Sequence, residues 1–213
     1  MPRRAASAFI GLVLFAAAAD AGTLRGSVVL PRAARGDSPA DPRDVVIWLE
    51  AIPERTERRL ALGPSPGWFR RRVPEPAPVL LQARLRFEPQ VVSVVVGRAL
   101  EVRNRDSVWH GAFSVSPEHA FDLGKRPPGR SDSVRFARPG VAAVRCDIHP
   151  GMSAAVVVTP NHARARPDAG GRWQLPAVPT GRYVLRAWAP GGGELRREVR
   201  VPRWGFAEVA LRW

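Results

Sequence analysis

The stretch LQARLRFEPQVVSVVVGRALEVRN, residues 81–104, decides the fold class of this protein. Apolar side chains occupy the odd positions of its first seven residues, and polar side chains occupy the even ones. That period of two predicts a half-buried β-strand over residues 81–87. Two apolar runs follow at 91–96 and 99–104, separated by Gly97-Arg98, and each has the length and composition of a further strand.

Strand-like segments continue over the rest of the chain. The 22 prolines and 19 glycines interrupt every run that could become a long helix, and no amphipathic helix of three turns is visible. Hydrophobic residues make up 45% of the 213 residues, which is enough to bury a core. We therefore predict an all-β protein. The other predicted strands are 24–30, 45–49, 109–115, 133–136, 141–146, 154–159, 173–175, 183–188, 194–201 and 206–213.

The N-terminus has the layout of a secretory signal peptide. Arg3 and Arg4 precede an apolar stretch over residues 8–19, and Ala19-Asp20-Ala21 offers small residues for cleavage before Gly22. Residues 1–21 are therefore predicted to be removed, which places the mature protein in the periplasm or outside the cell. A retained N-terminal anchor is the alternative. The apolar stretch is short for a membrane span, so we expect no integral membrane protein after signal removal.

The formal net charge of +14 comes almost entirely from arginine, since Lys125 is the only lysine. The chain is also rich in Ala, Pro, Gly and Val, so a GC-rich genome explains the composition at least as well as a polyanion site does. Export removes nucleic acid as an accessible partner. The charge instead favours acidic protein partners, and the basic run Arg70-Arg71-Arg72 is interpreted as a solvated loop.

The chemistry-bearing residues gather in Cys146-Asp147-Ile148-His149-Pro150-Gly151-Met152. Cys146 is the only cysteine, so it has no partner for a disulfide within the chain, which is unusual in an exported protein. A thiolate, an imidazole and a thioether at C-x2-H-x2-M spacing are three of the four ligand types of a type 1 copper site. His110, on a different strand-like segment, is the natural second imidazole. We predict one copper ion held by His110, Cys146, His149 and Met152.

Other chemistries fit the residues less well. Zinc prefers Cys, His and carboxylate ligands, so Met152 would be out of character. A single cysteine excludes covalent haem attachment through C-x-x-C-H, and a Cys146–His149 nucleophile lacks an orienting group nearby. Multicopper oxidases and nitrite reductases need several histidine pairs, but the remaining histidines, His119 and His162, are not arranged as H-x-H. Both are predicted to lie at the surface. We therefore expect no enzyme activity. The alternative to a metal site is that Cys146 is a buried inert thiol, His149 a turn residue and Met152 a core residue.

The motif C-x2-H-P-x-M resembles the ligand loop of the amicyanins, which are short-loop blue copper proteins. The wider stretch over residues 78–160 is similar to the plastocyanin-like (cupredoxin) domains of exported, methylamine-utilization-like bacterial proteins. This resemblance implies a Greek-key β-sandwich with one type 1 copper ion. Two positions depart from the pattern: Gly111 stands where cupredoxins usually have asparagine, and Gly151 stands where amicyanins have a bulky residue.

The C-terminal motif RWQLPAVPTGRYVLRAWAP, residues 172–190, resembles the transthyretin-like fold of carboxypeptidase regulatory-like modules. The resemblance implies that residues 22–50 and 165–213 form one small, discontinuous β-sandwich interrupted by the copper domain. Residues 51–77 are then predicted to be a loop or linker. Two consecutive domains, or one merged sandwich, are the alternatives.

A copper site of this kind predicts electron transfer by cycling between Cu(II) and Cu(I), with a transient redox partner protein. Asn104, Asp106 and Ser114 are candidates for hydrogen bonds around the ligands. Copper storage or sensing, or a metal-free structural or binding module with the same fold, is the alternative function.

Overall fold

The computed structural model describes residues 21–30, 41–61 and 75–213. The predicted signal peptide and the run Arg70–Arg72 lie outside the described residues, apart from Ala21. In the described ranges β-strands dominate the regular structure and helices are few, which confirms the all-β prediction. No helix in these ranges has both the length and the apolar character needed to cross a membrane.

The strands are short and follow one another closely. In chain order the elements are β1 Ala21–Val29, the 3-10 turn η1 Pro42–Asp44, β2 Val46–Leu49, α1 Glu54–Ala61, β3 Val79–Ala83, β4 Arg86–Glu88, β5 Val91–Val95, β6 Ala99–Asn104, β7 Phe113–Ser114, β8 Phe121–Asp122, β9 Ser131–Arg135, β10 Gly140–Arg145, β11 Ser153–Thr159, β12 Arg164–Ala165, β13 Arg172–Pro179, β14 Gly181–Ala189, β15 Gly193–Val201 and β16 Phe206–Arg212.

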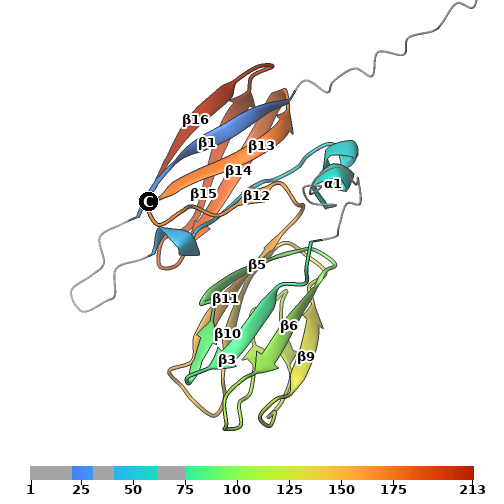
Figure 1. Ribbon diagram of the computed structural model, residues 1–213, viewed down its shortest axis with the longest axis vertical. Coiled ribbons are helices and arrows are strands. Elements are labelled where there is room, and N and C mark those ends of the chain that lie inside the picture. The colour runs from blue at the N-terminus through green and yellow to red at the C-terminus, as the bar shows by residue number, and fades with distance from the viewer. Residues whose placement is uncertain (1–20, 31–40, 62–74) are drawn as a thin grey trace, which may run out of the picture.

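The middle of the chain forms the first β-sandwich. One sheet has the strand order β5-β11-β10-β7-β8 and the other has the order β4-β3-β6-β9. Most neighbours are antiparallel, but β3 runs parallel to β6 and β5 runs parallel to β11. Inward side chains such as Val94, Leu100 and Val156 are fully buried between the sheets. This sandwich carries all the predicted metal ligands, and it occupies the lower part of Figure 1.

The two ends of the chain form the second β-sandwich, in the upper part of Figure 1. One sheet has the order β13-β1-β16 and the other has the order β12-β2-β14-β15. Because β1 pairs with both β13 and β16, the N-terminal strand is inserted between two C-terminal strands. Leu24, Ile47 and Leu185 share its core. This second, smaller sandwich is built from segments separated by more than a hundred residues.

A third apolar cluster joins the two sandwiches. All four residues of β2 are buried, because alternate side chains face different cores. Ile47 faces the core of the second sandwich, whereas Val46 and Trp48 pack against Val91 and Val157 of the first. This double burial explains why the strand reads as an unbroken apolar run.

The prediction of a single strand over residues 81–87 is wrong. The chain forms a hairpin there, in which Gln82 pairs with Phe87, and Leu85 is 52% exposed in the turn. Gln82 points inward instead of its apolar neighbours, because its amide donates to the carbonyl of Gly111 at 2.7 Å. Arg84 and Leu85 both have φ of 56°, which matches the two-residue turns that suit a hairpin.

The predicted loop or linker over residues 51–77 contains the helix α1, which the sequence analysis missed. Two backbone N–H groups of its first turn, those of Thr56 and Glu57, donate to the carbonyl of Pro53. Acidic residues lie in its first turn and basic residues in its last, and this arrangement complements the helix dipole. At eight residues the helix is too short for a clear periodic signal.

Candidate metal centre

The loop between β10 and β11 places three of the predicted ligands. The N–H of Cys146 donates to the carbonyl of Met152 at 3.3 Å, and the N–H of Met152 donates to that of His149 at 2.9 Å. These two bonds fold residues 146–152 into a closed turn. Cys146 is 4% exposed, Met152 is 1% exposed, and both belong to the core of the first sandwich. His149 is only partly buried, so one side of its ring faces solvent.

The fourth predicted ligand, His110, lies in the segment that precedes β7. The predicted strand over residues 109–115 shrinks to Phe113–Ser114, and His110 instead makes an isolated bridge with Arg126. Two backbone hydrogen bonds form this bridge, at 3.1 and 2.7 Å. The side-chain amide of Asn104 donates to the carbonyls of Val108 and Arg126 and fastens both sides of the bridge. His110 is completely buried.

The structure brings the side chains of His110, Cys146 and His149 together. The two Nδ1 atoms are 3.0 Å apart, and the Sγ of Cys146 lies 3.9 Å from the Nδ1 of His110 and 3.8 Å from that of His149. In the part of the chain that the structure describes, this is the only cluster of three such groups with metal-ligand geometry. Three donor atoms therefore converge on one point from two separate loops.

The triangle of donor atoms has the size that a first-row metal ion needs. With sides of 3.0, 3.8 and 3.9 Å, the point equidistant from all three atoms lies about 2.1 Å from each; metal–imidazole and metal–thiolate bonds in proteins are about 2.0–2.3 Å. Two imidazole nitrogens and one thiolate sulfur would supply three of the donors that a blue copper site needs. The residues present thus fit a copper ion without any movement of the donors.

Asp106 orients the buried imidazole. Its Oδ2 lies 2.8 Å from the Nε2 of His110, so Nε2 carries the proton and the lone pair of Nδ1 is free to bind a metal. The same carboxylate accepts the backbone N–H groups of Arg84 and Leu85, at 2.6 and 2.9 Å. Burial raises the pKa of Asp106, but these three hydrogen bonds outweigh it and leave the pKa below its usual value. Asp106 therefore connects the β3–β4 turn to the ligand.

Gly111 lies against the loop that carries Cys146. Its N–H donates to the Sγ of Cys146 at 3.4 Å. A Cβ atom added at this position would lie 1.9 Å from Oδ1 of Asp147, so Asp147 occupies the space of a side chain. Asp147 immediately follows the cysteine, and the contact joins the two ligand loops. Gln82, which the sequence analysis did not single out, completes this link through the carbonyl of Gly111.

The solvent side of the site is open, and its lining mixes apolar residues with polar ones such as Arg86 and Gln90. A depression of about 480 Å³ is lined by Leu85, His149, Pro150 and Met152, among others. Trp109 is 54% exposed beside His110 in the sequence. The partly exposed His149 therefore lies in a shallow surface of mixed polarity that a second protein can cover.

The other predicted residues lie elsewhere. The hydroxyl of Ser114 accepts the N–H of Ser116 and is not bonded to a ligand. The surface prediction for His119 and His162 is wrong. His119 is 6% exposed with its ring against Phe136, and the side chain of His162 is 11% exposed and bonded to Glu57. His119 packs against the core of the first sandwich, and His162 contacts α1. Neither contact could be predicted from a single histidine in a polar segment.

No protein-family model matches the chain, and the comparison with curated proteins finds no match. Among solved structures, a mutant of amicyanin in its Cu(I) form is 25% identical over 40% of this chain and 85% of that chain, with a TM-score of 0.37. An oxidized amicyanin mutant is 27% identical over 38% and 81%, with a TM-score of 0.36. A purple cupredoxin from Nitrosopumilus maritimus is 20% identical over 38% and 99%, with a TM-score of 0.35.

Proposed function

We propose that the protein is a mononuclear type 1 copper protein that transfers electrons. The observation that carries this proposal is the triangle of Cys146 Sγ and the two Nδ1 atoms, whose in-plane centre lies about 2.1 Å from each donor. A buried thiol with two converging imidazoles is the donor set of blue copper sites. Met152, in the same closed loop, is proposed as the fourth ligand.

The protein's part in this function is to hold the donors still. Copper bound here would supply a one-electron couple between Cu(II) and Cu(I). His110 is immobilised by the Arg126 bridge and by Asp106, and Cys146 by its backbone bond to Met152. Gly111 donates its N–H to the sulfur and so stabilises negative charge on it. Donors fixed in this way would move little when the bound metal gains or loses an electron. A small movement of the donors would keep electron transfer fast.

Electrons are proposed to enter and leave through His149. Of the four proposed ligands it is the one that is partly exposed, and it lies in the surface depression with Leu85 and Pro150. A transient redox partner, for which the net charge of +14 favours an acidic protein, would dock on this surface. Export to the periplasm or the extracellular space, through the signal peptide at residues 1–21, is part of the same proposal.

The two sandwiches are proposed as two domains. Residues 78–160 would form the cupredoxin copper domain, and residues 22–50 with 165–213 would form a transthyretin-like module. Each sandwich has its own cluster of buried apolar residues among the described residues, and these two separate cores support the division. The cluster around Trp48 then holds the copper domain against the second module instead of leaving it on a free tether.

The test is a titration of the purified, metal-free protein with Cu(II). An intense visible absorption from thiolate-to-copper charge transfer is expected at one equivalent, together with reversible reduction. Cys146→Ser should abolish the band, whereas His119→Ala, a histidine outside the cluster, should leave it intact. A protein that binds copper without this band, or that binds none, supports storage, sensing or a metal-free module instead and refutes the electron-transfer proposal.

A further inference from the structure

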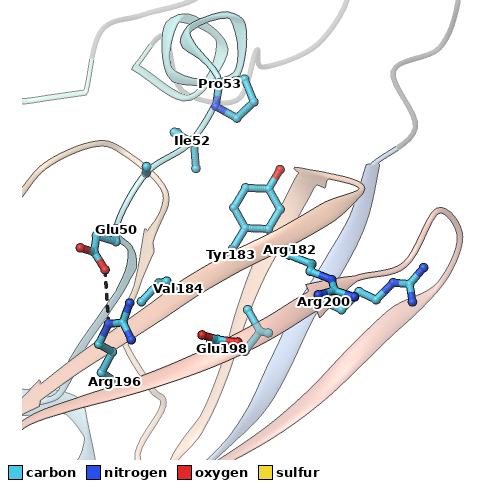
Figure 2. A pocket seen from close by; sticks show the side chains of 11 residues that line it. Glu50, Ile52, Pro53, Arg182, Tyr183, Val184, Arg196, Glu198 and Arg200 are labelled. Atoms are coloured by element: carbon cyan, nitrogen blue, oxygen red, sulfur yellow. Dashed lines mark ion pairs between the residues drawn. The ribbon is translucent and has the colours of Figure 1, made fainter.

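An open groove of about 910 Å³ lies on the second β-sandwich and shares no residue with the metal centre. One wall is the segment from Glu50 to Pro53, which leads from β2 to α1, and the floor is formed by β14 and β15. Figure 2 shows the ring of Tyr183 pointing toward Ile52 and Pro53, so this side of the groove is apolar.

Two guanidinium groups lie on the other side of the groove. Arg182 of β14 and Arg200 of β15 are directly opposite in register, and both are exposed. Like charges at opposite positions of paired strands are destabilising. Among the described residues neither arginine makes an ion pair or a side-chain hydrogen bond, and the nearby Glu198 makes none either. The two unpaired arginines and the single unpaired glutamate therefore leave the groove with a net positive charge that the described part of the chain does not neutralise.

A second arginine pair on the same sheet provides an internal comparison. Arg186 and Arg196 are also directly opposite in register. There the chain supplies carboxylates: Arg186 pairs with Glu194 and with Glu50, and Arg196 pairs with Glu50 at 3.7 Å, which Figure 2 marks. The pair Arg186–Arg196 is thus neutralised by carboxylates of the chain itself. The pair Arg182–Arg200 has no such carboxylate partner among the described residues.

The edge of β14 is open beside the uncompensated pair. β2 pairs with β14 as far as Leu49, and the N–H of Glu50 still donates to the carbonyl of Val184 at 2.9 Å. The chain then turns away toward α1. Backbone groups two residues apart on a strand point the same way, so those of Arg182 face this gap. In the described ranges no backbone bond reaches them, and such an edge accepts an extended chain.

We propose that this groove binds an extended acidic peptide segment of a partner protein. The peptide backbone would pair with the open edge at Arg182, carboxylates would lie over Arg182 and Arg200, and apolar side chains would contact Ile52 and Tyr183. A second copy of this chain is disfavoured as the occupant, because both copies would carry a strongly positive net charge, +14 for the full sequence. The surface is independent of copper, so the proposed function and this binding site stand or fall separately.

The first test measures peptide binding to the purified protein, with and without copper. The probe is a fluorescent peptide of alternating glutamate and leucine, and the readout is fluorescence anisotropy at low and moderate salt. Combined Arg182→Ala and Arg200→Ala substitutions should weaken binding by up to about 25-fold, since exposed ion pairs contribute up to about fivefold each. The control Arg212→Ala, an exposed arginine of β16 in the other sheet, should change affinity less than twofold. Equal binding by the double variant and the parent overturns the proposal.

The second test separates a peptide from a general anion. Two N-methylated versions of the probe are compared, one methylated at the odd-numbered amides and the other at the even-numbered amides. One version should lose binding and the other should keep it, because only one set of amides faces β14. The double variant should also unfold at or above the temperature of the parent protein, because it loses a like-charge contact. If both methylated peptides bind equally well, the surface is an unspecific basic one and the proposal is overturned. The same holds if dextran sulfate binds as tightly as the peptide when both are compared per negative charge.

Discussion

The hydrogen bonds of Asp106 make it the residue whose removal should reveal most about the metal centre. Asp106→Ala removes one acceptor from three donors: the N–H groups of Arg84 and Leu85 and the Nε2 of His110. Water can replace the carboxylate at the two exposed turn residues. It cannot reach Nε2 freely, since His110 is 0% exposed. The cost therefore falls mainly on the histidine.

The expected magnitude follows from this difference. A buried donor left without a partner costs about 1–3 kcal/mol, and each solvated turn bond adds about 0.5–1 kcal/mol. The metal-free protein should therefore lose about 2–5 kcal/mol of unfolding free energy. Because Asp106 also fixes the tautomer of His110, copper affinity should fall about 10- to 100-fold, as for other residues that orient metal ligands.

Two assays measure these effects separately. Denaturant unfolding of the metal-free protein gives the stability, and competition with a chelator gives the copper affinity. Asp122→Ala is the matched control, because that carboxylate accepts a single exposed N–H, from Gly124 at 2.7 Å; it should cost no more than about 1 kcal/mol. A loss below about 1 kcal/mol for Asp106→Ala, with unchanged copper affinity, would refute the role assigned to this carboxylate.

Three further predictions concern the interface, the ligand loops and pH. Trp48→Ala should cost about 3–5 kcal/mol and split thermal unfolding into two transitions, because Trp48 is 5% exposed between the sandwiches; a single unshifted transition in calorimetry would contradict this. Gly111→Ala should lower copper affinity, and adding Asp147→Ala should restore most of it, since the added methyl meets the Asp147 carboxylate; additive losses in the double variant would exclude that clash. Burial raises the pKa of Asp44 despite the nearby Arg166, so ionisation of Asp44 destabilises the native state as pH rises above its ordinary value of about 3.8. Asp44→Asn should therefore stabilise the protein at pH 7 but not at pH 3, in urea titrations at both values.

Much of the fold is local enough to be predicted. The apolar runs at β5, β6 and β11 are strands within a residue of the expected bounds, because β-branched residues between turn signals have few other options. The hairpin at residues 81–87 could not be found in this way. Its alternating pattern suits one strand equally well, and the inward position of Gln82 depends on Gly111, 29 residues further along the chain.

The arginine-rich segments show the same limit. The sequence predicted strands over 183–188 and 194–201, yet Arg182 and Arg200 become neighbours only through the register of β14 with β15. A shift by one residue would place them on opposite faces of the sheet. The acidic and apolar surroundings of each arginine are therefore a property of strand pairing and not of composition.

By itself, the sequence determined the all-β class and the close spacing of Cys146, His149 and Met152, because both depend on residues a few positions apart. Tertiary structure alone decided that His110 meets the cysteine 3.9 Å away, that Asp106 holds its far nitrogen, and that Asp147 fills the space at Gly111. These contacts join separate loops. Their geometry follows from how two sheets pack, and a linear pattern carries no record of that packing.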